Sequence, residues 1–175
     1  LDDALARAGD IGMPAQNMML GDASGRIAWR LAAQMPARVG DCDIQAPVDP
    51  RAGCEWLGWR PASANPSLVD PPSGRLWTAN ARTVDGEMLK MVGDAGYANG
   101  ARARQIRDDL FSRQRFGERD LMAIQLDDRA VFLQRWWKLL RAQALASKDP
   151  AWSAFEAATR NWEGRATVDS VSYRL

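Results

Sequence analysis

The stretch best suited to present a side chain for chemistry is residues 71–82, PPSGRLWTANAR. Its double proline and Ser-Gly turn end the preceding element. Residues 75–79 then have the bulky side chains typical of a short strand. Asn80 follows at the expected strand tip, which would hold a hydrogen-bond donor still and exposed. The alternative is a turn asparagine that bonds to its own backbone.

Composition excludes several kinds of chemistry. The 175 residues include no histidine, which rules out Ser-His-Asp and Cys-His catalysis within this chain and removes the commonest zinc ligand. The only two cysteines, Cys42 and Cys54, are too few for a metal site, and they are either disulfide-bonded or free thiols. The net charge of +1 gives no reason to expect a nucleic acid partner. No apolar run reaches the ~18 residues of a membrane span, and no signal peptide opens the sequence.

The elements that must position Asn80 begin with a predicted helix at Asp2–Ala8 and a β-hairpin formed by residues 17–20 and 27–31. Alternation along the hairpin predicts one apolar face, with Arg26 and Arg30 on the other. We expect that apolar face to comprise Met18, Leu20, Ile27, Trp29 and Leu31.

A long Pro- and Gly-rich connection over residues 36–70 follows the hairpin. We expect its Trp56 and Trp59 to pin the loop to the body of the protein, the alternative being that they line an acyl pocket. Residues 85–100 show no clear period. The sequence therefore predicts a β-rich segment over residues 1–99.

Residues 100–175 are predicted to be helical. A helix over residues 101–112 has a stripe at Ala103, Ile106 and Leu110, and a long helical region covers residues 118–146. Asp149-Pro150 predicts an N-cap and first helical residue. For the long region we expect an inward face of Ala130, Leu133, Trp137, Leu140 and Ala144, widened by Phe132, Trp136 and Leu139.

Four segments in chain order carry a family resemblance. They are PAQN with DASGRIAWR at residues 14–30, PPSGRLWTANAR at 71–82, GARARQIR at 100–107 and IQLD at 124–127. In this order they are similar to the PQN…AD.xGNIAYR hairpin, the NPPSG…TANN segment, the GxRARRI helix start and the IQLD segment of the penicillin acylase (penicillin amidase) family of N-terminal nucleophile hydrolases. Together they extend over nearly the whole chain.

The resemblance implies an α+β fold that is part of an αββα sandwich, with a β-hairpin and an oxyanion strand followed by a helical segment. The family's β chain begins with a catalytic serine, whereas this sequence begins Leu1-Asp2-Asp3. We therefore expect an internal segment of the β chain, inactive alone. Its partners are then the rest of the β chain, the α chain of the same precursor and a small N-acyl substrate.

The resemblance also assigns roles to residues. In the family a serine at the free N-terminus attacks an amide, and its own α-amino group, with a reference pKa near ~8, accepts the proton, so histidine is not needed. Asn80 matches the asparagine that donates to the oxyanion, although Ala81 replaces the second asparagine of the motif. Arg102 matches a supporting arginine near the amine; the alternative is a surface ion pair with Asp108 or Asp109. Asn17 is expected to brace the sheet.

Family members commonly bind a structural calcium ion. Asp85 and Asp94 lie in the matching stretch, but neither fits a ligand position, so we expect no cofactor or metal in this segment. The family resemblance also implies a periplasmic or secreted protein, made as a zymogen and serving antibiotic metabolism. Two alternatives to a penicillin-type amidase stay open: an acyl-homoserine lactone acylase, and a non-catalytic binding or assembly domain on the same scaffold.

Overall fold

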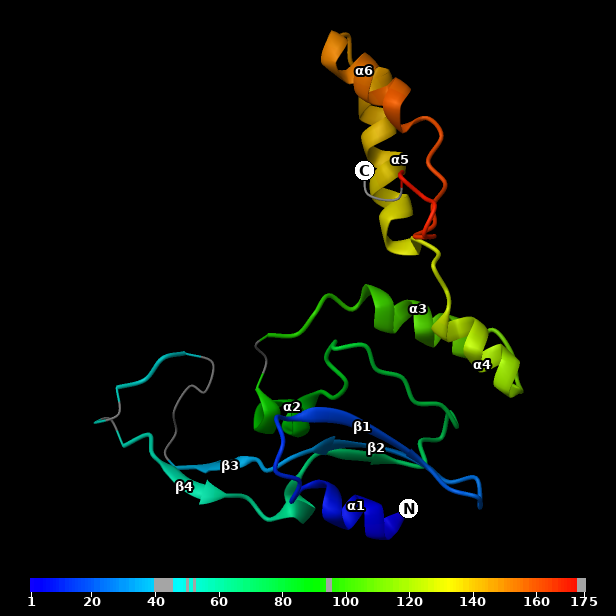
Figure 1. Ribbon diagram of the computed structural model, residues 1–175. Helices are drawn as coiled ribbons and strands as arrows, with labels where there is room; N and C mark the ends of the chain where they lie inside the picture. The colour runs from blue at the N-terminus through cyan, green and yellow to red at the C-terminus, as the bar shows by residue number, and fades with distance from the viewer. Residues whose placement is uncertain (40–45, 50, 52, 94–95, 173–175) are drawn as a thin grey trace. The chain divides into compact units, whose positions relative to one another are not determined.

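The computed structural model describes residues 1–39, 46–49, 51, 53–93 and 96–172. The chain divides into two compact units, Leu1–Leu110 and Phe111–Leu175. Figure 1 shows the elements of both units.

The first unit is built on a three-stranded antiparallel sheet of order β1-β2-β5. Its strands are β1 (Gln16–Gly21), β2 (Ile27–Ala32) and β5 (Ser67–Val69). The turn between β1 and β2 is held by Asp22, whose Oδ1 accepts hydrogen bonds from the backbone N–H groups of Ser24 (2.9 Å) and Arg26 (3.2 Å). The hairpin and the first helix, α1 (Asp2–Ala8), are therefore confirmed.

The register of the hairpin corrects the predicted faces. Met19 lies opposite Trp29 and Asn17 opposite Leu31, whereas Met18 lies opposite Arg30. Because paired residues share a face of an antiparallel sheet, Met18 belongs with Arg30 and not with Trp29. Leu20, opposite Ala28, also lies on the Arg30 face. Side chains alternate along each strand as predicted. The length of the turn sets the register, however, and it shifts one strand by one residue relative to the predicted pairing.

The Arg30 face is covered by α1 and a short 3₁₀ helix, η2 (Ala62–Ala64). The two helices approach so closely that a Cβ on Gly9 would lie 2.6 Å from the Cα of Ala62, so only glycine fits there. Arg30 is 6% exposed and donates to the carbonyl oxygen of Ala62. Burial lowers the pKa of its guanidinium. Figure 1 shows α1 on this side of the hairpin and α2 (Gly86–Val92) on the other.

Asn65 joins the 3₁₀ helix to the sheet. It is 3% exposed, and its Nδ2 donates to the carbonyl oxygens of Leu31 (2.9 Å) and Ala33 (2.7 Å). Ala33 has a φ of +90°, which lies in the left-handed region. The Asn65 amide thus satisfies two backbone acceptors where strand β2 ends and the chain turns.

The strand predicted over residues 75–79 is absent, although the structure describes that stretch throughout; β5 forms earlier, at Ser67–Val69. Asp70 (φ +45°) and the two prolines after it end the ladder, because proline has no N–H to donate. Both edges of β2 are already taken by β1 and β5. The stretch that follows the turn runs without a sheet partner.

The Asp70 side chain ties the end of β5 to the hairpin. Its Oδ1 accepts from the backbone N–H of Ile27 (3.0 Å), and its Oδ2 accepts from Nε of Arg26 (2.9 Å). The Arg26 guanidinium lowers the pKa of this carboxyl. Arg26 also contacts Asp2 at 2.9 Å, so one cation links α1, the hairpin and β5.

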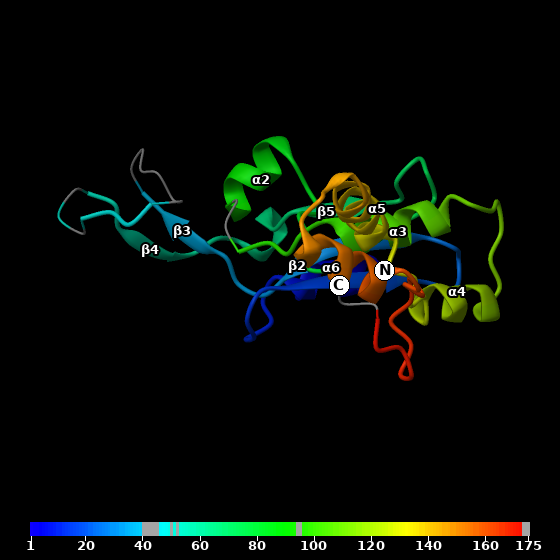
Figure 2. The same cartoon turned by 90° about the horizontal axis from the view of Figure 1, so that it is seen from above.

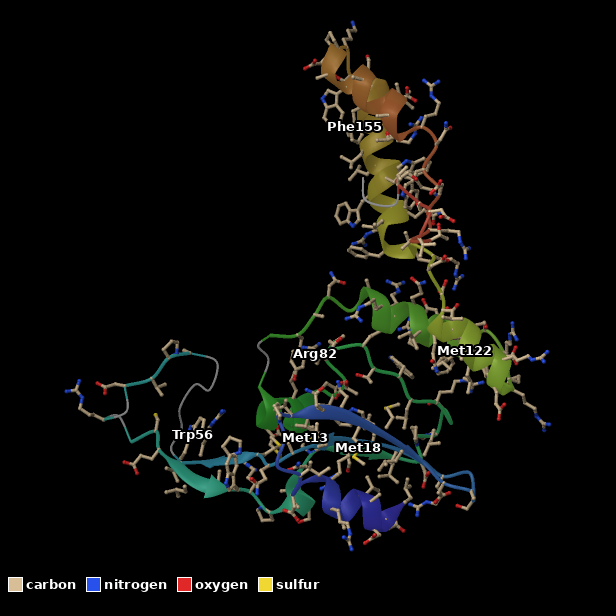
Figure 3. The ribbon with its side chains drawn as sticks, in the orientation of Figure 1. Met13, Met18, Trp56, Arg82, Met122 and Phe155 are labelled. Atoms are coloured by element: carbon tan, nitrogen blue, oxygen red, sulfur yellow. The ribbon has the colours of Figure 1, made fainter. Side chains whose placement is uncertain are left out.

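A second, two-stranded sheet pairs β3 (Pro36–Arg38) with β4 (Trp56–Trp59) (Figure 2). Trp56 is 67% exposed and Trp59 58% exposed, so they do not pin the connection to the body of this unit as predicted. Figure 3 shows Trp56 on β4. Arg38 lies over the Trp56 ring at 5.6 Å from its centroid. Cys54 is disulfide-bonded; Cys42 lies outside the described residues.

Helix α3 (Ala101–Leu110) completes the first unit. It begins after Asn99, whose Oδ1 accepts from the backbone N–H of Ala101 at 2.9 Å. The predicted stripe of Ala103, Ile106 and Leu110 is half-buried, while Arg102 and Arg104 are exposed. Helix α2 was not predicted.

The second unit is helical, with α4 (Glu118–Gln125), α5 (Val131–Ala146) and α6 (Pro150–Thr159). The predicted long helical region is therefore two helices, separated where Asp127 accepts from the N–H of Arg129 (3.1 Å). Asp149 caps α6 by accepting from Ala151 N–H at 2.8 Å, as predicted, with Pro150 as the first helical residue.

Helix α5 packs against α6 (Figure 1). Trp137 stacks on Trp162 with centroids 5.2 Å apart and donates from Nε1 to the carbonyl oxygen of Thr159 at 3.0 Å. The predicted inward face from Ala130 to Ala144 is confirmed as half-buried or buried. Its predicted widening is wrong, because Phe132, Trp136 and Leu139 are 37%, 44% and 50% exposed. Within the described part of this unit, α6 packs along one side of α5.

None of the helices in the described ranges is long and apolar enough to span a membrane.

Candidate active site

The two residues predicted to act together, Asn80 and Arg102, are in direct contact. Nη2 of Arg102 donates to Oδ1 of Asn80 at 3.0 Å and to the carbonyl oxygen of Ala79 at 3.1 Å. An arginine NH₂ group carries two hydrogens, so one nitrogen serves both acceptors. A guanidinium can only donate, and the side-chain atom that faces it must therefore be the oxygen of the amide. The Nδ2 group of Asn80, a double donor, is left for another acceptor.

Helix α3 positions the stretch that ends in Asn80. At the start of the helix Arg102 holds Ala79 and Asn80. At its end, the carbonyl oxygen of Leu110 accepts from Nε of Arg75 at 2.6 Å, a favourable place for a cation. The stretch from Arg75 to Asn80 therefore runs antiparallel to the helix and is tied to both of its ends. This replaces the predicted strand as the means of holding Asn80.

The backbone at Asn80 is left-handed, with φ +59°. Asparagine tolerates this region better than most residues. The carbonyl oxygen of Asn80 accepts from the backbone N–H of Ala98 at 3.0 Å. Both the backbone and the side-chain oxygen of Asn80 are thus fixed, and the side chain is exposed at this end of the stretch.

Asn80 lines a pocket of about 350 Å³. The Asn17–Trp29–Leu31 face of the hairpin contributes one side, and the end of α2 with the residues after it contributes another. Tyr97, on that second side, donates from its hydroxyl to the carbonyl oxygen of Gly93 at 3.0 Å. The lining residues are Ala15, Gln16, Asn17, Trp29, Leu31, Asn80, Thr83, Val84, Val92, Gly93, Gly96 and Tyr97.

A second amide, that of Asn17, lines the same pocket. Its Oδ1 accepts from Nε1 of Trp29 at 2.9 Å. Trp29 is 2% exposed and is held by the core of the sheet. The contact between Asn17 and Trp29 fits the predicted bracing of the sheet.

Trp29, Thr83 and Tyr97 are among the pocket residues that sequence reasoning missed. Alternation along the hairpin placed Trp29 on the apolar face but did not indicate its hydrogen bond to Asn17. Thr83 and Tyr97 lie in irregular backbone, where no periodicity singles out a residue. Arg104 contacts Asp108 at 3.7 Å on the exposed side of α3, in keeping with a surface ion pair.

Of the two aspartates considered as calcium ligands, the structure describes one. Asp85 is exposed at the N-cap of α2, and Asp94 lies outside the described residues. Within the described ranges no group of three or more His, Cys, Asp or Glu side chains is placed to hold a metal ion. The expectation of a segment without a cofactor or metal stays a prediction.

A family model described as penicillin amidase matches residues 1–175 of the chain. The chain is 29% identical over 161 residues to penicillin acylase 2 proenzyme of Pseudomonas sp. strain SE83, covering 91% of this chain and 20% of that protein. It is also 29% identical over 145 residues to acyl-homoserine lactone acylase QuiP of Pseudomonas fluorescens Pf-5, covering 82% of this chain and 17% of that protein.

The structure is similar to that of a thermostable penicillin G acylase from Alcaligenes faecalis, with a TM-score of 0.62 at 20% sequence identity. The match covers 96% of this chain and 30% of the acylase chain. At this identity the similarity confirms the expected α+β fold. The chain spans about a fifth of the length of the curated relatives it matches.

Proposed function

The chain belongs to the penicillin amidase family, and on that premise we propose that it is part of an amidohydrolase that cleaves N-acyl amides, with Asn80 as an oxyanion donor. The observation that carries the proposal is the contact between Arg102 and Asn80 at 3.0 Å beside the pocket. This contact turns the Asn80 oxygen away and leaves Nδ2 to donate to a substrate oxygen.

In the proposed reaction, a serine at the free N-terminus of the β chain attacks the carbonyl carbon of the amide. The α-amino group of that serine accepts the hydroxyl proton. The carbonyl oxygen becomes an oxyanion, to which Asn80 Nδ2 donates. Collapse of the intermediate breaks the C–N bond, the leaving amine takes the proton, and water then hydrolyses the acyl-enzyme.

Arg102 acts through Asn80 in this proposal. Its permanent charge also disfavours protonation of a nearby amine and so keeps that amine a base. The residues of this chain supply the donor and its support but not the nucleophile, and we propose that the chain alone is inactive. The rest of the precursor, from both the α and β chains, supplies the nucleophile and the remaining pocket walls.

A second candidate substrate class is supported by one of the relatives. The chain is as identical to an acyl-homoserine lactone acylase as to a penicillin acylase, at 29%. We propose N-acyl amides of both kinds as the substrates to test. The disulfide at Cys54 supports a periplasmic or secreted location, since disulfides persist in oxidising compartments.

The decisive experiment measures hydrolysis of a penicillin and of an N-acyl-homoserine lactone by the full-length protein and by its Asn80→Ala variant. We expect kcat to fall by about 10²–10³ with folding intact, which is typical when one oxyanion donor is removed. A near-normal rate would remove Asn80 from the oxyanion site. Absence of hydrolysis of either substrate by the wild-type protein would favour the binding or assembly domain instead.

A further inference from the structure

The pocket presents two amide side chains in the same way. Each has its oxygen held by a partner that can only donate: the Arg102 guanidinium for Asn80 at 3.0 Å, and the Trp29 indole for Asn17 at 2.9 Å. Both orientations are therefore fixed. In each case the NH₂ group is left on the side away from the partner.

The placement of Asn17 is rigid. It lies on β1 directly opposite Leu31, on the face that it shares with Trp29. Trp29 is 2% exposed, so its indole cannot follow the amide if the amide rotates. Asn17 itself is half-buried. Within the described part of the chain its Nδ2 has no hydrogen-bond partner, although the amide is fixed in position.

A braced amide of this kind suits substrate recognition. A site on a strand is held more precisely than a site on a loop. If the only role of Asn17 were to accept the hydrogen bond from Trp29, a side chain that can only accept, such as a carboxylate, would serve equally well. Asn17 instead lines a pocket whose other amide side chain is the proposed oxyanion donor, and its NH₂ group is the end that Trp29 does not hold.

We propose that Asn17 is a substrate-positioning residue whose Nδ2 donates to a second carbonyl oxygen of the substrate, on the amine side of the scissile bond. This inference rests on the proposed function. A β-lactam amide and an N-acyl-homoserine lactone share one polar feature beyond the scissile amide: a ring carbonyl on the carbon next to the one that bears the amide nitrogen. A single donor at Asn17 therefore serves both classes.

The first test compares Asn17→Asp with Asn17→Leu in the full-length protein. The aspartate keeps an oxygen for the Trp29 indole but presents an acceptor to the pocket, whereas the leucine loses both interactions. We expect Asn17→Asp to keep the thermal stability of the wild-type protein while kcat/KM for an N-acyl-homoserine lactone falls about tenfold or more. A purely bracing role predicts wild-type kinetics for Asn17→Asp, and that result would overturn the proposal.

The second test changes the substrate. The wild-type protein is assayed with N-acyl-homoserine lactones and with the matching N-acyl-3-aminotetrahydrofurans, which keep the ring and lack its carbonyl. Octanoyl and phenylacetyl forms of each are used. We expect kcat/KM to be about tenfold higher for the lactones, and Asn17→Asp to abolish this preference. Equal values for both rings in the wild-type protein sink the inference alone, whereas no hydrolysis of any compound sinks the proposed function as well.

Discussion

Arg102 donates from Nη2 to the side-chain oxygen of Asn80 at 3.0 Å, across 22 residues of sequence. The same nitrogen also bonds the carbonyl oxygen of the residue before Asn80. The contact decides which end of the Asn80 amide is held by Arg102 and which end is left to donate. Arg102, on the surface of α3, thereby leaves the Asn80 side chain to act as a hydrogen-bond donor.

Replacing Arg102 should reduce catalysis more than stability. In Arg102→Ala the amide of Asn80 loses the donor that orients it, and we expect kcat/KM of the full-length protein to fall about 10- to 100-fold, as for loss of a charge-assisted hydrogen bond of about 1.5–3 kcal/mol. Steady-state kinetics and thermal unfolding measure the two effects. Arg104→Ala, on the exposed side of the same helix, is the matched control and should keep near-normal rates.

The left-handed backbone at Asn80 separates its structural and chemical roles. Asn80→Gly and Asn80→Ala both remove the donor, so we expect equal losses of activity. Only alanine is strained at φ +59°, and it should lower the free energy of unfolding by about 1–2 kcal/mol relative to glycine. Urea unfolding of the two variants measures this difference. A glycine variant that retains activity would contradict the proposed donor.

Asn65 should matter for stability. In Asn65→Leu the carbonyl oxygens of Leu31 and Ala33 lose their donor in a buried place. We expect the free energy of unfolding to fall by about 2–4 kcal/mol, since each unsatisfied buried acceptor costs about 1–3 kcal/mol. Chemical denaturation measures the change. The exposed Asp10→Asn, in the same unit, is the control and should stay within about 0.5 kcal/mol.

The α5–α6 pair should lose stability in acid. Arg160 and Arg141 hold the pKa of Glu156 at about 2, below its ordinary 4.5. A carboxyl with a lowered folded-state pKa stabilises the fold above its unfolded-state pKa, and this contribution is lost as pH falls from about 4.5 to about 2. Hydrogen exchange of α5 and α6 amides across this range should show weakening protection. Glu156→Gln should flatten the dependence, while Glu163→Gln, the control in the same unit, should preserve it.

Much of the first unit could be predicted because local signals and packing agree there. The Asp2–Ala8 helix and the hairpin follow from short-range patterns that the structure confirms, as does the Asp149 cap in the second unit. The faces of the hairpin could not be predicted, because register depends on how many residues the turn takes up. The exposure of Trp56 and Trp59 depends on what packs against β4, which no local pattern encodes.

The candidate site was predictable in part. The resemblance to the family predicted that Asn80 and Arg102 belong to one site. In the structure Nη2 of Arg102 lies 3.0 Å from Oδ1 of Asn80. The oxyanion role stays a prediction. How Asn80 is held was predicted wrongly: the bulky residues at 75–79 are typical of a strand, but hydrogen bonds of Arg75 and Arg102 tie this stretch to α3 instead. The hydrogen bond between Trp29 and Asn17 joins side chains of two strands. The pattern of residue types along the sequence does not show which side-chain atoms come into contact.

The attachment of residues 75–80 to both ends of α3 has a mechanical consequence. The segment is tied at both ends, and the eight-residue step from Arg102 to Leu110 separates the two contacts by about 12 Å along the helix axis. Loss of the hydrogen bond between Arg75 and the carbonyl oxygen of Leu110 would make the Asn80 amide more mobile. No atom of the pocket wall would be changed. Catalytic precision could therefore be tuned, by selection or by an engineer, from a position well outside the reaction centre.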